Sequence, residues 1–559
     1  MSDMSASKRE FGTYQQAISA FSWRDALADL GWLDQPTVDL AWTIVDRHAR
    51  GARADQTAIL WVSAEGAERR ITFREVSQQS MRVGDLLQRI GIRKGDRVAT
   101  VLPRIPETLP VILGIFRVGA IFVPIFSGFG EDAVAYRLDH SGANAVCVSG
   151  RYRHLVPARD GMSIIGVNDP VTTPRDGDID YASALARESD ICEAEGFARD
   201  EPAAIIYTSG STGQPKGCVI AANILAAMWP YVHYGLDLRP GGDVFWPTGD
   251  PSWGYGLCCY LPALAMGGSV LCVEPNATPE VCLRIIDKYK VSNLATTPTV
   301  LRGLMAQGDA VRAAGSSVRA ISSCGEPLNG EVVEFFRRVW NVTPMDHFGA
   351  TEFGLPIGNH NAVQMAVKPG SMGLPAPGQC MAVVDERGEE LPPETIGLIA
   401  QRCDDNSRYW LRYWSDEAAS AGLRRGRWIC TGDLARRDAD GYFWFEGRSD
   451  DIIKSAGYRI GPFEIESALL RHNAVVEAAV IGIPDDLRGQ IVKACVVTRP
   501  GVERSQRLAD ELVALVKTVC GQHQYPRAIE FMDSLPKTQT GKIQRFLLRQ
   551  RHLSDKAST

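Results

Sequence analysis

Short apolar runs alternate with helical patterns through the first half of the chain. The runs Val98–Leu102, Ala120–Pro124 and Asn144–Val148 predict buried strands, and a helical pattern lies between the first two. Upstream, Thr57–Val62 and Arg69–Thr72 predict two strands that pair. Strands that are apolar on both faces and alternate with helices indicate a largely parallel sheet that is covered on both sides. We therefore expect an α/β fold.

The pattern changes near residue 450, after the polar stretch Ser449–Asp451. Beyond it the sequence predicts a helix, two strands and a second helix, over Phe463–His472, Val475–Ile483, Ile491–Thr498 and Leu508–Val519. A chain of 559 residues is too long for one hydrophobic core. We therefore expect a large N-terminal α/β domain over residues 1–449 and a small α+β domain over residues 450–559.

Composition and charge exclude several classes of protein. A hydrophobic content of 45% and a charged content of 23% are typical of a globular protein, and a net charge of −6 argues against a surface that coats nucleic acid. The 13 cysteines include no C-x-x-C pair, so we expect reduced thiols and a cytoplasmic protein. We expect no secretory signal at the start of the chain and no membrane span. The most apolar stretch, Leu109–Phe126, contains Arg117 and two prolines, and it predicts a buried helix and strand.

The stretch Tyr207–Gly217 carries the clearest chemical pattern. An apolar strand leads into a loop with three glycines, four Ser or Thr hydroxyls and Lys216. Glycines let backbone amides approach phosphate oxygens, hydroxyls donate hydrogen bonds, and the lysine adds charge. It is not a Walker A loop, because Pro215 precedes Lys216 and a second strand, not a helix, is predicted from Gly217. A flexible linker is the alternative, but Pro215 and Lys216 are atypical of linkers.

Later segments offer further candidates, each with a simpler structural alternative. Trp253 lies among glycines and could line a substrate tunnel or belong to the core. The turn Gly325–Pro327 follows a predicted strand, where ligands often bind in open α/β sheets. Thr351 offers a hydroxyl and Glu352 a hard oxygen ligand for Mg²⁺, or both lie in a solvated loop. Asp433, presented from the end of a predicted strand, could accept hydrogen bonds from a ribose.

Taken in order, these segments resemble the signatures of the adenylate-forming enzymes, which include the acyl-CoA synthetases. The resemblance covers about residues 40–550 and includes Leu535–Arg545, which is similar to the family's segment with the catalytic lysine. The stretch Gly457–Glu466 is most similar to medium-chain acyl-CoA synthetases. The resemblance implies a large adenylation domain and a mobile C-terminal domain that turns about Asp450.

The resemblance also implies a role for each matched residue. Lys542, Thr351 and Glu352 would be catalytic, with Glu352 as the Mg²⁺ ligand. The ATP-binding set would be Thr208, Ser209, Gly210, Ser211, Thr212, Gly213, Lys216, Gly325, Glu326, Pro327, Asp346, His347, Phe348, Gly349, Ala350, Thr351, Asp433, Arg448, Arg459 and Lys542. Trp253 and Gly349 would line the acyl pocket. The coenzyme A contacts would be Ala456, Gly457, Tyr458, Arg488, Tyr525, Pro526 and Arg527.

Two departures from the family pattern bear on the substrate. Ala350 replaces the usual glutamine beside the acyl carboxylate, and Gly349 stands where acetate-specific members have a tryptophan. An open tunnel at Gly349 predicts an acid longer than acetate. His347 is interpreted as structural or as part of the pocket lining rather than as a general base, because a carboxylate is already a nucleophile at neutral pH.

The function that the resemblance implies is an ATP-dependent carboxylic acid:CoA ligase. It would activate a short- or medium-chain acid, with branched and aromatic acids included, as acyl-AMP and transfer the acyl group to coenzyme A, releasing AMP and pyrophosphate. ATP, Mg²⁺ and coenzyme A are the expected cofactors and co-substrates, and the acid is a small molecule. The alternatives are transfer of the acyl group to a carrier protein and a nucleotide-binding protein without catalysis. The sequence leaves the acid and the oligomeric state open.

Overall fold

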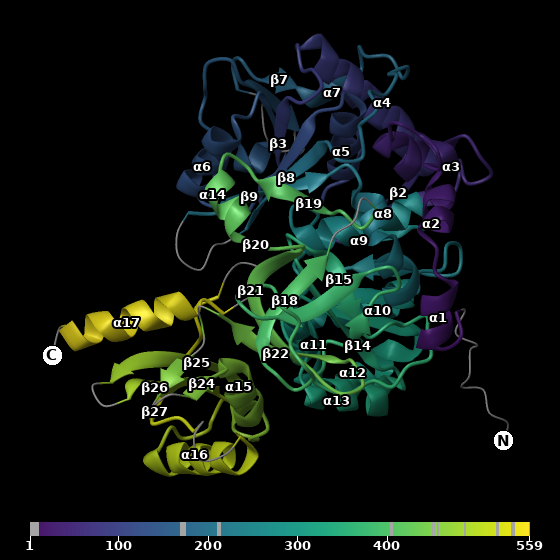
Figure 1. The fold of residues 1–559 in the computed structure, drawn as a ribbon. Helices are drawn as coiled ribbons and strands as arrows, with labels where there is room; N and C mark the ends of the chain where they lie inside the picture. Colours follow the sequence, from purple (N-terminus) through teal and green to yellow (C-terminus); the bar gives the residue numbers. More distant parts are fainter. Residues whose placement is uncertain are drawn as a thin grey trace.

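The structure is a computed structural model that describes most of the chain. It covers residues 11–167, 175–208, 214–402, 406–449, 451, 453–455, 458–485, 488–520, 525–537 and 543–557, with the backbone alone at 454, 458–459 and 555–557. The described residues form three sheets in a large N-terminal part and a fourth sheet in a small C-terminal part (Figure 1). This arrangement confirms the predicted α/β fold with a smaller α+β domain.

An eight-stranded, mostly parallel sheet lies at the top of Figure 1. Its order is β19 (Trp410–Tyr413), β9 (Lys216–Ala221), β8 (Pro202–Thr208), β4 (Ile121–Pro124), β3 (Arg97–Val101), β5 (Ala145–Ser149), β6 (Ser163–Val167) and β7 (Ile179–Asp180). Side chains alternate between two hydrophobic cores: Val98 and Phe122 face one, and Ala99 and Ile121 face the other. The sheet is therefore covered on both sides, as the apolar strands predict.

A second sheet of nine strands forms the middle of the molecule. Its order is β16 (Leu374–Pro375), β15 (Gly354–Gly358), β14 (Pro344–Ala350), β13 (Ala320–Cys324), β12 (Asn293–Thr296), β10 (Phe245–Pro247), β11 (Val270–Val273), β1 (Thr57–Val62) and β2 (Glu68–Thr72). The predicted pairing of β1 and β2 is confirmed, in antiparallel register. The strands β12, β13 and β14 are parallel, so their carboxyl ends meet at one edge of the sheet.

Helices of the N-terminal part fill the faces of these sheets. They are α1 (Tyr14–Ala20), α2 (Trp23–Leu30), α3 (Arg47–Ala49), α4 (Phe73–Arg89), α5 (Thr108–Arg117), α6 (Glu131–Ser141), α7 (Tyr181–Leu185), α8 (Ile224–Pro230), α9 (Gly254–Ala265), α10 (Pro279–Tyr289), α11 (Pro298–Met305), α12 (Asp309–Ala314), α13 (Gly330–Trp340) and α14 (Glu417–Gly422). Every residue of α5 is buried, and β4 follows it, so the most apolar stretch is a core helix and strand, as predicted. In the described part of the chain, no helix has the length and apolar character that crossing a membrane requires.

A third, antiparallel sheet lies between the nine-stranded sheet and the C-terminal part (Figure 1). It contains β17 (Cys380–Val384), β18 (Gly397–Arg402), β21 (Trp428–Arg437) and β20 (Arg424–Arg425), and β22 (Phe443–Arg448) pairs with β21. The sequence analysis placed Asp433 at the end of a strand. That prediction is wrong, because β21 continues for four residues beyond it. Gly432, with a φ of +85°, lets the chain bend within the strand instead of ending it.

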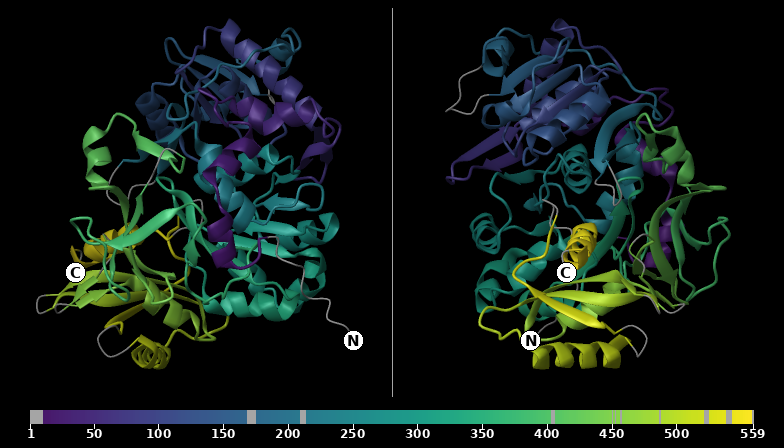
Figure 2. Two further views of the ribbon diagram at one scale, coloured as in Figure 1. Left: turned by 45° about the vertical axis from the view of Figure 1, so that its right-hand side comes forward. Right: turned by 90° about the vertical axis from the view of Figure 1, so that its left-hand side faces the viewer.

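The C-terminal part has its own sheet and core. The sheet order is β24 (Tyr458–Ile460), β23 (Ile453–Ser455), β26 (Gly489–Thr498) and β25 (Val475–Asp485), with β27 (Ala528–Met532) on β26. The helices α15 (Pro462–Leu470) and α16 (Gln506–Cys520) pack on one core, and α17 (Arg545–Ala557) adds Leu548 to another. The four elements predicted here are therefore confirmed. The views in Figure 2 show this part beside the third sheet.

Candidate functional site

The proposed phosphate loop joins two adjacent antiparallel strands, β8 and β9. Thr208 pairs with Lys216 across the hairpin, so the two ends of the loop lie side by side. The predicted second strand is confirmed, and it requires a glycine at its start: a Cβ on Gly217 would lie 2.8 Å from the Ile205 side chain. Lys216 is exposed. Ser209, Gly210, Ser211, Thr212 and Gly213, between these ends, lie outside the described residues.

Glu352 follows β14, on the turn that leads into β15, and it is 8% exposed. Its Oε1 atom accepts a hydrogen bond of 2.6 Å from the Tyr413 hydroxyl and one of 3.5 Å from the Cys218 thiol. Its Oε2 atom accepts no hydrogen bond from the residues that the structure describes. The carboxylate is thus held through one oxygen, and the other is available to water or a ligand. Glu352 therefore has the chemistry that a hard cation needs.

Tyr413, which the sequence analysis did not single out, joins three of the candidate residues. Its hydroxyl reaches Glu352, the Lys216 ammonium lies 5.1 Å from the centre of its ring, and its phenol lies within the electrostatic influence of Arg448. Burial and the neighbouring Glu352 carboxylate raise the pKa of Tyr413 above its ordinary range, so the phenol keeps its proton and donates it. Candidates from β9 and the β14–β15 turn therefore contact the same side chain, which Arg448 on β22 influences electrostatically.

The turn Gly325–Pro327 lies where the sequence predicts, directly after β13. Because β13 and β14 are parallel and Cys324 pairs with His347, this turn lies beside the segment after His347. Gly325 has a φ of +99°, which favours glycine. The Glu326 carboxylate accepts hydrogen bonds from Thr299 at 2.7 and 2.9 Å and from Arg302 at 2.5 Å. The turn is thus fixed to α11 by its own glutamate.

Asp346 and His347 lie in the core with exposed fractions of 6% and 2%. Burial raises the pKa of Asp346 well above its ordinary value and lowers the pKa of His347 to about 3, so the His347 imidazole is neutral. The His347 ring packs against Tyr231 with ring centres 5.1 Å apart. This buried placement is compatible with the interpretation of His347 as structural or as part of the pocket lining.

Thr351 and Trp253 come together at the start of α9. A Cβ on Gly254 would lie 3.8 Å from the Thr351 hydroxyl, and Gly254 follows Trp253 directly. The Trp253 ring lies 5.6 Å from both Phe126 and Phe129, between centres. The candidate acyl residue Trp253 therefore belongs to an aromatic cluster next to the candidate threonine.

The expected open tunnel at Gly349 is not found. A Cβ at this position would lie 2.2 Å from the Gly354 carbonyl oxygen and 2.6 Å from the Leu355 side chain. The strand pairing is irregular here, between Phe348 and Ala350, and it brings the β15 backbone against Gly349. The glycine therefore permits close approach of two strands and leaves no free volume. The argument that it admits an acid longer than acetate is wrong.

Asp433 and Arg448 face each other on the paired strands β21 and β22. The Arg448 guanidinium lies 3.4 Å from Asp433 Oδ1, and the Thr431 hydroxyl donates to Oδ2 at 2.6 Å. Asp433 is 8% exposed, whereas the Arg448 side chain is 43% exposed. The aspartate thus has a defined partner on each of its two oxygens.

The C-terminal candidates are only partly described. Arg488 is exposed, and Tyr525 lies between the cations of Lys517 and Arg527, at 4.2 and 4.7 Å from its ring centre. Pro526 is buried. The hinge residue Asp450 and the candidates Ala456, Gly457 and Lys542 lie outside the described residues, as do the side chains of Tyr458 and Arg459.

The C-terminal part contacts the N-terminal part through α15. The Asn329 amide donates to the Ser467 hydroxyl at 3.2 Å, and Arg471 lies 3.3 Å from Glu331. The rings of Phe445 on β22 and Phe463 on α15 lie 6.3 Å apart, between centres. The two polar contacts are partly exposed, and contacts of this kind are compatible with movement between domains.

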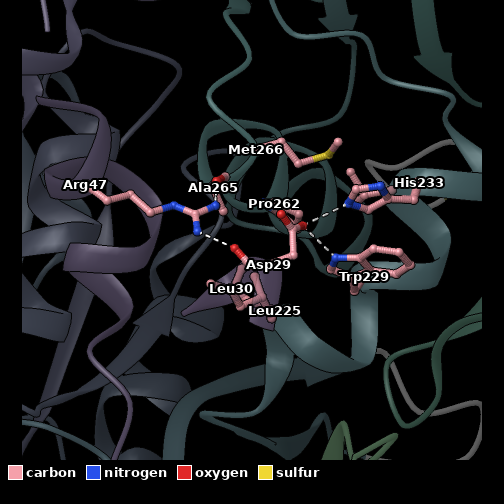
Figure 3. Close-up of a pocket in the computed structure, with 10 residues that line it drawn as sticks. Asp29, Leu30, Arg47, Leu225, Trp229, His233, Pro262, Ala265 and Met266 are labelled. Atoms are coloured by element: carbon pink, nitrogen blue, oxygen red, sulfur yellow. Dashed lines mark hydrogen bonds and ion pairs between the residues drawn. The ribbon is translucent and has the colours of Figure 1, made fainter. Parts of the chain in front are cut away.

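A cavity elsewhere in the molecule is a poor candidate for a substrate site (Figure 3). It lies between α2, α3, α8 and α9, and Asp29 accepts there from Trp229 at 2.9 Å and pairs with His233 at 3.5 Å. Its volume is about 10 Å³, room for about one water molecule. None of the candidate residues lines it.

The candidate site suits Mg²⁺ better than a transition metal. No group of three or more His, Cys, Asp and Glu side chains that could hold a metal occurs among the residues with described positions. Mg²⁺ commonly binds through one or two carboxylates together with substrate phosphates and water. A single carboxylate with a free oxygen, beside Lys216 and the proposed phosphate loop, fits that mode.

Comparisons with known proteins agree with this geometry. Residues 45–407 match the family model of the AMP-binding enzymes, and residues 464–542 match the C-terminal domain of the AMP-binding enzymes. An acetyl-coenzyme A synthetase of Bacillus subtilis (strain 168) is 36% identical over 96% of this chain and 94% of its own length. The crystal structure of a Brucella canis acyl-CoA synthetase is also 36% identical, with a TM-score of 0.77, and covers 98% of this chain and 100% of its own.

A further solved structure has the same fold and was determined with a bound ligand. The anthranilate CoA ligase AuaEII, solved in complex with anthranoyl-AMP, has a TM-score of 0.83 and 28% identity, over 93% of this chain and 98% of its own. The matches span both the large and the small part of the chain, in the same order. The chain therefore belongs to the AMP-binding family of adenylate-forming enzymes and, within it, to the acyl-CoA synthetases.

Proposed function

We propose that this protein is an AMP-forming carboxylic acid:CoA ligase that makes an acyl-adenylate from ATP and transfers the acyl group to coenzyme A. One observation carries the proposal: Lys216 and Glu352, from distant segments, both contact Tyr413, and Arg448 influences its phenol electrostatically. A cation beside a phosphate loop, a free carboxylate oxygen and an arginine are the groups that a reacting nucleotide needs together. Structural roles alone would not require them at one place.

In the first half-reaction, a carboxylate oxygen of the acid attacks the α-phosphorus of ATP, and pyrophosphate leaves. The work of the protein is to position the two reactants and to stabilise negative charge on the phosphates. The 208–216 loop, with Lys216, holds the departing phosphates, Thr351 donates to the α-phosphate, and Asp433 accepts from the ribose. When bound, Mg²⁺ neutralises phosphate charge, and Glu352 is its protein ligand. Lys542 supplies further positive charge.

In the second half-reaction, the C-terminal domain turns about Asp450. Lys542 withdraws, the segment at Gly457 approaches, and the coenzyme A thiol attacks the acyl carbonyl with AMP as the leaving group. The predicted boundary between residues 449 and 450 falls between the two matched family regions. The polar contacts between the region of α15 and the start of α13 support such a movement, because polar, partly exposed contacts are typical of domains that move.

The acid is proposed to be a short- or medium-chain, branched or aromatic carboxylic acid. The cluster of Trp253, Phe126 and Phe129 beside Thr351 supports an apolar acyl group. With the tunnel argument at Gly349 withdrawn, acetate belongs among the candidates, as does an aromatic acid of the kind that AuaEII binds. The likeness of Gly457–Glu466 to medium-chain enzymes stays a prediction.

A cytoplasmic location is part of the proposal. The cysteines in the described part of the chain are all free thiols, and most of them are buried. Unpaired cysteines in this number support a reducing compartment, because disulfides are common in secreted proteins. Microscopy of a fluorescent fusion tests this location, and a secreted fusion would contradict it.

A pyrophosphate-release assay tests the function. The purified protein is offered ATP, Mg²⁺ and straight-chain acids from C2 to C12 or aryl carboxylic acids, with omission of the acid as control. We expect acid-dependent release of pyrophosphate and AMP, and formation of a thioester when coenzyme A is added. Release of ADP, or no ATP consumption with any acid, contradicts the proposal. Faster transfer to a phosphopantetheinylated carrier protein than to coenzyme A identifies the carrier as the acceptor.

A further inference from the structure

Tyr413 and Cys218 both donate to the same oxygen of Glu352. The Tyr413 hydroxyl lies 2.6 Å from Oε1 and the Cys218 thiol lies 3.5 Å from it. All three residues are nearly inaccessible, with exposed fractions of 6% for Tyr413, 0% for Cys218 and 8% for Glu352. The two donors leave Oε2 without a hydrogen bond from any described residue, so the carboxylate has one occupied and one available oxygen.

The strand register explains why both donors reach this oxygen. Tyr413 on β19 pairs directly with Cys218 on β9, so their side chains leave the same face of the sheet side by side. Glu352 meets them from the β14–β15 turn of the neighbouring sheet. The position of the carboxylate is therefore set by the contact of two sheets and not by its own loop.

The two hydrogen bonds differ in strength. A hydroxyl that donates to a carboxylate at 2.6 Å makes a short, charge-assisted hydrogen bond, which is about twice as strong as a neutral one. A thiol is a weak donor, and 3.5 Å is a long contact. Tyr413 is consequently the residue that fixes the orientation of the carboxylate, and Cys218 contributes less.

The Tyr413 ring also lies beneath Lys216, whose ammonium is 5.1 Å from the ring centre. Contact of a cation with the face of an aromatic ring is favourable and restricts where the lysine can lie. One side chain thus touches both the free carboxylate and the lysine at the end of the phosphate loop. Removing the hydroxyl alone would leave the ring, and so this second contact, in place.

We propose that Tyr413 is a positioning residue that holds Glu352 by Oε1 and presents Oε2 to the divalent cation of the bound nucleotide. This inference rests on the proposed function, in which Glu352 is the Mg²⁺ ligand. Residues that hydrogen-bond a metal ligand orient it, and their loss weakens metal affinity by about 10- to 100-fold. Tyr413 itself contacts neither the acid nor coenzyme A in this assignment.

The experiment measures cation affinity directly. Mn²⁺, which is visible by electron paramagnetic resonance, is titrated into the full-length protein saturated with a non-hydrolysable ATP analogue. Tyr413→Phe removes only the hydroxyl, and we expect the Kd for Mn²⁺ to rise by about 10-fold or more. Tyr260→Phe is the matched control, because it removes a buried hydroxyl that donates to the Pro247 carbonyl, and it should leave the Kd unchanged. Glu352→Gln should weaken Mn²⁺ binding at least as strongly as Tyr413→Phe.

A kinetic measurement separates positioning from general damage. The Mg²⁺ concentration for half-maximal pyrophosphate release should rise in Tyr413→Phe, while thioester formation from supplied acyl-AMP stays at the wild-type rate. If Tyr413→Phe does not fold, Cys218→Ala takes its place, with a smaller rise in the Kd expected. A wild-type Kd in Tyr413→Phe, with or without an effect of Glu352→Gln, overturns the inference. A different result would contradict the proposed function, namely the absence of acid-dependent pyrophosphate release in the unaltered protein.

Discussion

Replacing Arg545 by methionine should loosen the C-terminal domain. The Arg545 guanidinium donates to both oxygens of Glu466 at 2.8 Å, and it lies 3.5 Å from Asp451. It thereby connects the start of α17 with α15 and with the residue next to the proposed hinge. Glu466 is 6% exposed, and Val480 donates its backbone N–H to the same carboxylate at 2.8 Å. Methionine keeps the apolar stem of the arginine and removes the charge.

The size of the effect follows from what the substitution leaves behind. Removing one partner of a buried ion pair costs about 3–5 kcal/mol, because the other charge stays buried without compensation. Asp451 keeps Arg549 at 2.9 Å, so Glu466 alone loses its counter-charge. We therefore expect the free energy of unfolding of the C-terminal domain to fall by about 3 kcal/mol, near the lower limit of this range. Such a loss raises the population of the opened domain by about 100-fold.

Hydrogen exchange measured by mass spectrometry can resolve this loss within the intact protein. Peptides from β25 and β26 should exchange about 100-fold faster in Arg545→Met, while peptides from β3 and β4 serve as an internal control and stay at the wild-type rate. Adding Glu466→Met to the same chain should restore most of the protection, because the buried charge is then gone as well.

The loss of stability in Arg545→Met should also depend on pH, and it should grow as the pH rises. Without Arg545, burial raises the pKa of Glu466 in the folded state above its value in the unfolded chain, about 4.3. The folded variant then favours the neutral carboxyl, so its stability is greatest at low pH and falls as the pH rises. The difference from the wild type should be smaller at about pH 5.5 than at about pH 8. Equal exchange in Arg545→Met and the wild type, or no recovery in the double variant, would refute the reasoning.

We expect three further outcomes. Lys542→Ala should abolish pyrophosphate release and spare thioester formation from supplied acyl-AMP; equal loss of both would contradict its role. Gly349→Trp should lower Tm, because its Cβ would lie 2.2 Å from the Gly354 oxygen, whereas a wild-type Tm with a shorter preferred acid would restore the tunnel. Burial and then the nearby Glu464 raise the pKa of Glu446 to about 7, so the domain contact should weaken as the pH rises through 7. Limited proteolysis near residue 450 should be faster at about pH 8 than at about pH 6, and Glu446→Gln should remove that difference.

The local pattern of apolar and polar residues was sufficient to predict most of the helices and strands that we named from the sequence. The strands β3, β4 and β5 are apolar on both faces, and α16 carries Leu508, Leu512 and Val516 at helical spacing, so each could be placed within one or two residues. Pro462 marks the first residue of α15, because proline is well suited to that position. These signals come from residues that are close together in the sequence, so the sequence alone is sufficient to find them.

The parts that sequence missed depend on contacts between distant segments. Tyr413 lies in a four-residue strand with no motif around it, and its importance appears only when β19 pairs with β9, nearly two hundred residues earlier. The error at Gly349 also comes from a distant contact. In the sequence, the missing side chain suggested free space, but in the fold the strand β15 occupies that space. Asp433 was placed at a strand end because the strand-like run Arg427–Cys430 stops before it, although β21 continues to Arg437 and pairs with β22 from Asp433 onward.

The position of β1 has a consequence for how the protein is synthesised. Ile59 on β1 pairs in parallel with Val270 on β11, and the strands of the eight-stranded sheet from β3 to β9 lie between them in the chain. During synthesis on the ribosome, β1 emerges some two hundred residues before β11. The edge of β1 that pairs with β11 is therefore without its partner strand during that time. An unpaired strand edge is prone to join other chains. Nascent chains that stop before residue 270 should consequently depend on chaperones more than the finished protein does.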